Sequence, residues 1–232
     1  MHSRVQALNV QSFKVLRDGR VTAWPGMSTS STRSRLGALL VLLTLLSGCA
    51  SAPATRGRAA TPDETRGVER ALVPLLAVLD PPLAPGCPIA LGIVPARTIN
   101  AGIGLAQPKA GCQSLVLLVT EGTLRRLTLD MLRAILAHEL GHVRLGHLEA
   151  RKERGATPAV LRPFTVSFDR AQEADADRFA VSLLRRLEPR QPGACLALVY
   201  VLAQLAEQPG WLSSHPSPDR RAESVLAGCN AP

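Results

Sequence analysis

The chain has few aromatic side chains: two Trp, one Tyr and four Phe make up only 3% of its 232 residues. Nucleic-acid-binding surfaces commonly combine basic patches with aromatic rings that stack on bases, so this scarcity argues against such a surface. The formal net charge of +9 does not alter this conclusion, because residues 1–48 carry six basic side chains and one acidic side chain and so hold +5 of it. We therefore expect no nucleic-acid partner.

Long hydrophobic runs are also missing. The most apolar run, Leu36–Leu46, has 11 residues, whereas a helix needs about 20 to span a bilayer. It follows Arg33 and Arg35 and leads into small residues, a pattern typical of a secretory signal. We predict that residues 27–48, beginning at Met27, are a cleaved signal peptide rather than a retained transmembrane helix. Residues 1–26 precede this complete signal and show no periodicity, which indicates an untranslated or non-structural extension.

The end of the signal, Leu46-Ser47-Gly48-Cys49, resembles the lipobox of bacterial lipoproteins, in which the cysteine becomes the lipidated first residue. The alternative is an ordinary signal peptide that precedes a cysteine by chance. Acyl chains on Cys49 would anchor the protein, since each buried methylene contributes about 0.8 kcal/mol. Ala50 follows Cys49, which is similar to lipoproteins of the outer membrane. We expect a lipid anchor on the periplasmic face of the outer membrane, with residues 49–61 as a tether.

Cysteine is rare, with five residues in the chain. Apart from Cys49 there are four, Cys87, Cys112, Cys195 and Cys229, an even number that suits disulfides in an oxidising compartment. Of the three possible pairings we favour Cys87–Cys112 and Cys195–Cys229, because each joins segments that flank one local unit. Four buried thiols are the alternative. A cysteine-ligated zinc site is disfavoured, since no two of these residues have C-x-x-C spacing.

Residues 62–232 have the length of one domain, and 46% apolar content with 19% charged residues excludes a disordered chain. Helix signals begin at Thr61-Pro62, although Pro74 should kink or shorten that helix. Apolar periodicity predicts a second helix from Thr128 to about Arg151, and further helices around residues 170–187, 193–208 and 218–226. Residues 88–94 and 115–119 have strand character, on either side of a Gly-rich stretch. We expect a mainly helical α+β domain with a small antiparallel sheet.

The helix predicted from Thr128 contains His138-Glu139-Leu140-Gly141-His142, an HExxH motif. Four residues advance a helix by about 400°, so His138 and His142 lie one turn apart on one face and can bind the same ion. Glu139 is rotated by about 100° from His138, where it can reach a metal-bound water without being a ligand. Two surface histidines are the alternative.

A later helix contains Glu173-Ala174-Asp175-Ala176-Asp177, with Glu173 and Asp177 again one turn apart. Two His and one Glu leave tetrahedral zinc an open position for water, as hydrolytic sites require. Asp177 could accept the distal N–H of a ligand histidine and fix its tautomer. The alternative is a solvated acidic face beside Arg170 and Arg178.

These motifs and their order resemble the zinc metallopeptidase family that includes HtpX and the CAAX prenyl proteases. The resemblance covers roughly residues 64–228 and rests on Asn100-Ala101, HELGHVRLGH at 138–147, EADAD at 173–177 and HPSPDRR at 215–221. It implies a gluzincin-like fold and endopeptidase activity, often in envelope protein quality control. The soluble, periplasmic lipoprotein branch of the family is the most similar, since no transmembrane helices are predicted around the motif.

By position, the resemblance implies one zinc ion per chain, with His138, His142 and Glu173 as ligands and Glu139 as the base. Asp177 would lie beside the ligands. His215 would stabilise the oxyanion, and Arg221 would orient the C-terminal segment near the site; an exposed loop position is the alternative for His215. His147 lies five residues beyond His142, off the ligand face, so we expect a structural role for it.

The predicted function is thus zinc-dependent cleavage of peptide bonds in misfolded or misassembled envelope proteins. Substrates are expected to bind extended along the edge of the small sheet. Two alternatives stay open: a zinc-bearing envelope scaffold or chaperone that does not cut its clients, and a latent protease whose site is gated by the loop 151–169.

Overall fold

The computed structural model describes residues 10–12, 14–15, 21–22, 57–83, 87–106, 114–149, 168–189, 193–206 and 218–230. The predicted signal peptide, Cys49 and nearly all of the loop 151–169 lie outside these residues, and so does His215. Three short strands are described in the first 26 residues: β1 (Val10–Ser12), β2 (Lys14–Val15) and β3 (Val21–Thr22). Among the described residues, no helix is long and apolar enough to cross a membrane.

The sheet is built around three strands: β5 (Ile89–Val94), β6 (Ala101–Leu105) and β7 (Leu115–Thr120). They stand in the order β1-β5-β7-β6, and the two-residue strand β4 (Arg58–Ala59) also pairs with β5. β6 runs antiparallel to β7, but β5 and β7 are parallel, and so are β1 and β5. The sheet is therefore mixed, and the prediction of an antiparallel sheet is wrong on this point.

The reason for the parallel pair lies between the two predicted strands. The glycine-containing residues Ala101–Leu105 form a strand of their own, with Gly102 and Gly104 in the ladder opposite Leu118 and Val116. This strand, β6, pairs antiparallel with β7 and lies at the end of the sheet order. The chain therefore runs from β5 to β6 and only then to β7, which pairs with β5 in the parallel direction. Among the described strands, β6 is therefore the last in the sheet, and it contacts the helix that contains the HExxH motif.

In the described part of the chain, the longer helices are α1 (Pro62–Ala77), α3 (Leu129–Arg144), α5 (Arg170–Leu187), α6 (Gly193–Ala206) and α8 (Pro218–Asn230); a short helix, α2 (Glu121–Arg126), follows β7. The mainly helical α+β class is thus confirmed. In α1, Thr61 caps the N-terminus in a capping box with Glu64, and Pro74 is included three residues before the end. α5 has the predicted bounds, whereas α3 ends seven residues earlier than predicted and α8 continues four residues further.

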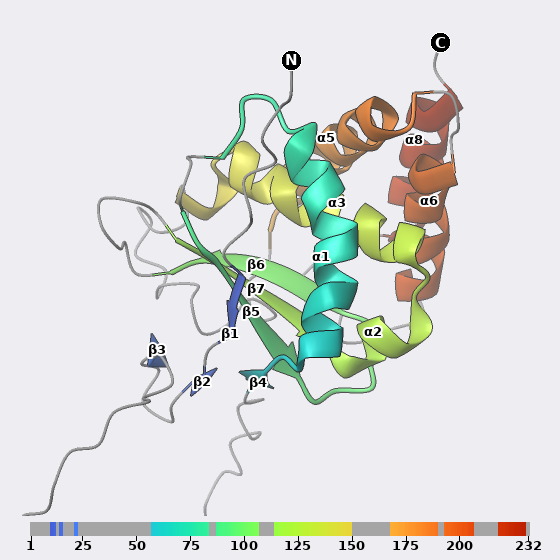
Figure 1. Cartoon of the computed structure of the whole chain (residues 1–232). Helices are drawn as coiled ribbons and strands as arrows, with labels where there is room; N and C mark the ends of the chain where they lie inside the picture. Colours follow the sequence, from blue (N-terminus) through green and yellow to red (C-terminus); the bar gives the residue numbers. More distant parts are fainter. Residues whose placement is uncertain are drawn as a thin grey trace, which may run out of the picture.

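The core lies between one face of the sheet and the helices, which gather on one side of the strands (Figure 1). In β5 and β7 the odd-numbered residues, such as Leu91 and Leu117, belong to this core, and the even-numbered Ala90 and Val116 belong to a smaller cluster on the opposite face. Alternation along a strand explains this division. α3 packs against α1, α5, α6 and β6, so its residues lie at the centre of the domain.

Candidate metal centre

The HExxH motif lies in the buried half of α3. Thr128 caps this helix by accepting a hydrogen bond from the Met131 amide, and every residue from Ala134 to His142 is buried. His138 is 1% exposed and His142 is fully buried, so neither is a surface histidine. Burial of two imidazoles and a carboxylate requires specific partners, because unpaired polar groups are costly in the interior.

The second acidic motif reaches the same place from α5. Asp169 caps α5 in a capping box with Gln172, which sets the start of the helix and places Glu173 in its first turn. Glu173 and Asp177 are 0% and 3% exposed, so the alternative of a solvated acidic face is wrong for both. Asp175, between them in the sequence, instead forms an exposed ion pair with Arg178.

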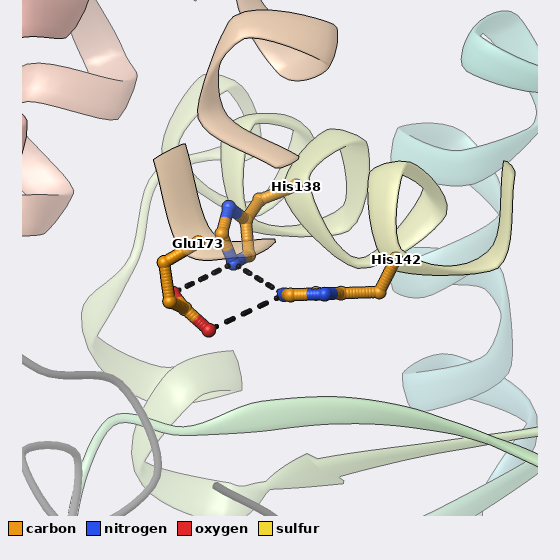
Figure 2. A group of neighbouring side chains, drawn as sticks. All are labelled: His138, His142 and Glu173. Atoms are coloured by element: carbon orange, nitrogen blue, oxygen red, sulfur yellow. Dashed lines mark hydrogen bonds and ion pairs between the residues drawn. The ribbon is translucent and has the colours of Figure 1, made fainter. Parts of the chain in front are cut away.

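Three predicted ligands come together at one point (Figure 2). The Nε2 atoms of His138 and His142 are 3.1 Å apart. Glu173 lies beside both, with Oε2 at 3.5 Å from Nε2 of His138 and Oε1 at 3.4 Å from Nε2 of His142. A tetrahedral zinc ion with bonds of about 2.0–2.2 Å separates its ligand atoms by about 3.3–3.6 Å. The two distances to Glu173 lie within this range and the distance between the imidazoles is slightly shorter. With a donor set of two imidazoles and one carboxylate, the three residues form a group that could hold a metal ion.

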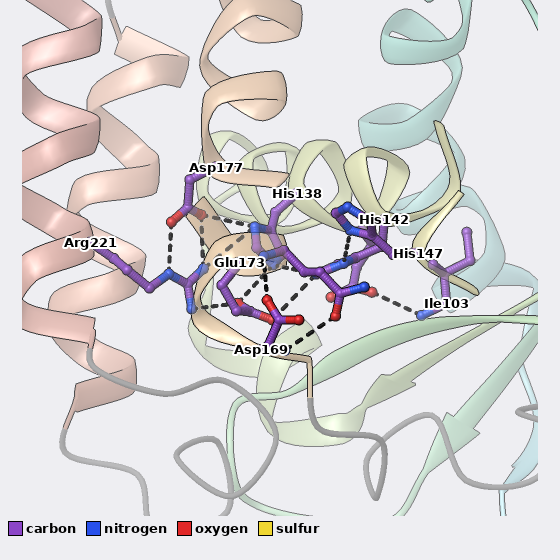
Figure 3. A network of polar contacts seen from close by, with 10 residues as sticks. Ile103, His138, His142, His147, Asp169, Glu173, Asp177 and Arg221 are labelled. Atoms are coloured by element: carbon purple, nitrogen blue, oxygen red, sulfur yellow. Dashed lines mark hydrogen bonds and ion pairs between the residues drawn. The ribbon is translucent and has the colours of Figure 1, made fainter. Parts of the chain in front are cut away.

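Each ligand is held by a buried neighbour (Figure 3). Asp177 accepts a hydrogen bond from His138 Nδ1 at 2.9 Å, as predicted, and this leaves Nε2 of His138 to face the ligand cluster. Arg221 on α8 donates to both oxygens of Asp177 at 2.7 and 2.8 Å and lies 2.7 Å from Glu173 Oε2. Arg221 therefore contacts two site residues directly, which is a closer role than orienting the C-terminal segment.

Burial and charge pull the pKa values of these groups apart. Burial would lower the pKa of His138, but its bonds to Asp177 and Glu173 outweigh this effect and raise it to about 9. Burial lowers the pKa of His142 to about 4. Burial would raise the pKa of Asp177, but Arg221 and His138 bring it down to about 2. The two predicted ligand histidines therefore differ, because hydrogen bonds favour the charged form of His138 and burial favours the neutral form of His142.

Glu139 stands apart from the ligand group. Its Oε2 accepts a hydrogen bond of 3.0 Å from the Ile103 amide on β6, and burial raises its pKa to about 7. Because Ile103 lies on β6, the last strand in the described sheet, this bond connects Glu139 of the HExxH motif to that strand. A carboxylate whose pKa is near neutrality is suited to taking up and releasing a proton.

His142 makes two contacts that were not predicted from the sequence. Its Nδ1 lies 3.0 Å from Nδ1 of His147, and its ring stacks on Phe168 with centroids 3.7 Å apart and planes 15° from parallel. His147 does lie off the ligand face, as expected, but it comes within hydrogen-bonding distance of a ligand. Gly146, with φ at 69°, follows the end of α3 at Arg144. In the sequence, this glycine between the two histidines was the signal that the helix ends before His147.

The remaining predicted residues have mixed outcomes. Cys195 and Cys229 form the predicted disulfide, which joins α6 to α8. Cys87 is also disulfide-bonded, while Cys112, its predicted partner, lies outside the described residues. The pairing of these two therefore stays a prediction, as do the roles of His215 and Cys49.

Comparison with known families agrees with this geometry. Residues 106–232 match the family described as Peptidase U49. The matched segment is more than half of the chain and contains the whole HExxH helix, Glu173, Asp177 and Arg221. No curated protein matches the chain.

Proposed function

We propose that this chain, which belongs to the Peptidase U49 family, is a zinc-dependent endopeptidase with one zinc ion per chain. His138, His142 and Glu173 would hold the ion. The observation that carries the proposal is Glu139, which is buried next to these ligands, stands outside their group and is held by the Ile103 amide. A purely structural zinc site has no use for a buried carboxylate at this position, whereas a hydrolytic site needs a base there.

In this proposal zinc, when bound, supplies Lewis acidity that lowers the pKa of water towards 7 and polarises the scissile carbonyl. Glu139 accepts a proton from the attacking water on one oxygen while the Ile103 amide steadies the other. It then gives this proton to the leaving amine. Asp177 and Arg221 keep the ligands in place during both transfers. His215 is proposed to stabilise the oxyanion.

The substrate is proposed to lie along β6. This strand is at the end of the sheet order, and Glu139 reaches it through Ile103. An extended peptide that pairs with such an edge is held through its main chain, which suits a protease that accepts varied sequences. The scissile bond would then pass in front of Glu139.

The cellular setting is part of the proposal. The signal-like run, Cys49 after a lipobox-like sequence, and the similarity to HtpX and the CAAX prenyl proteases support a lipid-anchored enzyme of the bacterial envelope. Its clients would be misfolded or misassembled envelope proteins, and its place would be the periplasmic face of the outer membrane.

The decisive experiment compares Glu139→Gln with Glu173→Ala in zinc content and in cleavage of casein. Glu139→Gln keeps the size of the side chain, so we expect about one zinc per chain and almost no proteolysis, because both proton transfers need the carboxylate. Glu173→Ala removes a ligand, so zinc content and cleavage should fall together. Glu223→Gln, on the exposed side of α8, is the matched control and should behave as the wild type.

A Glu139→Gln protein that cleaves at the wild-type rate would place catalysis elsewhere. A wild type that binds zinc and cuts nothing, even after the loop 151–169 is trimmed, would favour the scaffold or chaperone. Cleavage that appears only after trimming would identify a latent protease.

A further inference from the structure

We infer that His147 is a positioning residue for the metal ligand His142: it accepts the Nδ1 proton of His142 and so keeps Nε2 free to bind a metal ion. The inference rests on the proposed function, because it concerns the same metal site. It starts from the contact between Nδ1 of His142 and Nδ1 of His147, 3.0 Å apart in a buried pair.

Tautomers decide how this contact must be formed. Nε2 of His142 faces Nε2 of His138 and the Glu173 carboxylate at 3.1 and 3.4 Å, so Nε2 is the atom that would bind the ion. A neutral imidazole that offers Nε2 as a ligand carries its proton on Nδ1. That N–H needs an acceptor, and Nδ1 of His147 lies within hydrogen-bonding distance of it. His147 must then be neutral and carry its own proton on Nε2.

The backbone is shaped to make this contact. In an unbroken helix, a residue five positions after His142 would be rotated by about 500°, which points it about 140° away from His142 around the helix axis. α3 instead ends at Arg144, and Gly146 adopts a left-handed conformation with φ at 69°. The Gly146 amide donates to the Val143 carbonyl at 3.2 Å, which closes the helix end. The following residue, His147, is turned back over the last turn of α3, where it meets His142.

Phe168 completes the restraint. It lies directly before Asp169, the cap of α5, and stacks on His142 with nearly parallel rings. Stacking fixes the plane of the imidazole but does not distinguish its two nitrogens. The bond to His147 makes that distinction, because a ring turned over about its χ2 axis would lose this acceptor.

His138 and His142 are thus held by acceptors of different charge. The acceptor of His138 is Asp177, whose negative charge is offset by Arg221. The acceptor of His142 is a neutral imidazole. Groups that orient metal ligands in this way typically contribute a factor of 10–100 to metal affinity.

Two variants of the full chain test the inference. His147→Asn can place its Oδ1 where Nδ1 of His147 lies, and His147→Leu has almost the same shape as Asn without an acceptor. We expect His147→Leu to weaken zinc binding about 10–100-fold in competition with a chelator, and His147→Asn to restore most of that affinity. Thermal unfolding of the metal-free variants shows whether they are equally folded, and the nitrogen chemical shifts of His142 report its tautomer.

The inference predicts that His142 shifts towards the Nε2–H tautomer in His147→Leu and keeps the Nδ1–H tautomer in His147→Asn. It is overturned if both variants bind zinc as tightly as the wild type, or if both lose the same affinity while folded. Zinc affinity is measured without a substrate, so a protein that binds zinc and cleaves nothing would contradict the proposed function and leave this inference standing. A wild type without zinc affinity would overturn both.

Discussion

Arg221 on α8 lies 2.7 Å from Oε2 of Glu173 on α5, and both residues are buried. The guanidinium therefore contacts a predicted metal ligand at the same time as it holds Asp177 through two hydrogen bonds. The last helix of the chain thus contributes a buried positive charge beside two buried carboxylates, which also face His138. This relationship makes the site and the C-terminal helix depend on each other.

We predict that Arg221→Ala destabilises the metal-free protein by about 3 kcal/mol, because it leaves the charges of Glu173 and Asp177 unbalanced in the interior. Without Arg221, Asp177 also loses the two bonds that hold it against His138, so zinc affinity should fall as well. The rise in Tm on adding zinc should therefore be smaller in Arg221→Ala than in the wild type. Arg220→Ala is the matched control, since Arg220 is the exposed neighbour on α8; an equal rise in all three proteins would contradict the prediction.

A second prediction concerns the Cys195–Cys229 disulfide, which closes a segment of 34 residues and ties α8 to α6. Replacing both cysteines with Ala should lower the free energy of unfolding by about 3–4 kcal/mol on chain-entropy grounds. Zinc affinity should also fall, because α8 carries Arg221 about two turns before Cys229. Urea unfolding and chelator competition measure the two effects.

The matched control replaces Cys87 and Cys112, the other predicted pair, neither of which belongs to α8. This change should lower stability without lowering zinc affinity in the folded protein. Equal zinc affinities in both double variants would show that the disulfide does not act on the metal site.

A third prediction concerns pH and lies away from the metal site. Arg58 donates to both oxygens of Glu64 at 2.8 and 2.6 Å, and these bonds lower the pKa of Glu64 from 4.5 to about 2. Because the pKa is lower in the folded state, ionised Glu64 stabilises the protein above pH 4.5, and this contribution is lost as the pH falls towards 2. The Glu64→Gln variant keeps the capping box with Thr61 and removes only the charge.

The difference in free energy of unfolding between the wild type and Glu64→Gln should therefore be about 1 kcal/mol at pH 7 and shrink towards zero in acid. Urea unfolding at several pH values measures it. Glu223→Gln, on the exposed side of α8, reports the effect of net charge alone. A difference that grows on acidification would have the wrong sign for this mechanism.

The sequence predicted the residues of the buried His138, His142 and Glu173 group because helix periodicity is a local property. One turn separates His138 from His142, and another separates Glu173 from Asp177, so each pair could be placed on one face without knowing the fold. The bounds of α5 were predicted from its apolar pattern, and the structure shows that Asp169 caps the helix directly before Arg170. That the two helices meet, however, had no local signal and came from the family resemblance.

Other features depend on residues distant in the sequence. The pairing of β5 with β7 is parallel because β6 intervenes, and the strand character of β6 is weak in a segment with two glycines. The contact between His142 and His147 depends on the left-handed conformation of Gly146, which ends α3 early. Periodicity carried the prediction of α3 through this glycine and so placed the helix end near Arg151.

The final prediction concerns Gly141, which lies within the HExxH motif and faces α5. A Cβ at this position would lie 3.0 Å from both the Cα and the carbonyl oxygen of Ala176, and 3.3 Å from its Cβ. Backbone atoms cannot move aside as the end of a flexible side chain can, so α3 and α5 would have to separate. Gly141→Ala should therefore destabilise the protein by about 1–3 kcal/mol, despite the higher helix propensity of alanine.

Separation of these helices also moves His138 and His142 away from Glu173, so zinc affinity should fall with stability. The Gly141→Ala variant carrying Ala176→Gly tests the cause: it removes the Cβ at 3.3 Å but leaves the two backbone contacts at 3.0 Å, so most of the loss should persist. Gly146→Ala is the contrasting control, because a Cβ there meets nothing within 4 Å and its cost comes only from φ at 69°. Full recovery by Ala176→Gly would mean that the side chain, and not the backbone of α5, limits how closely the two helices approach.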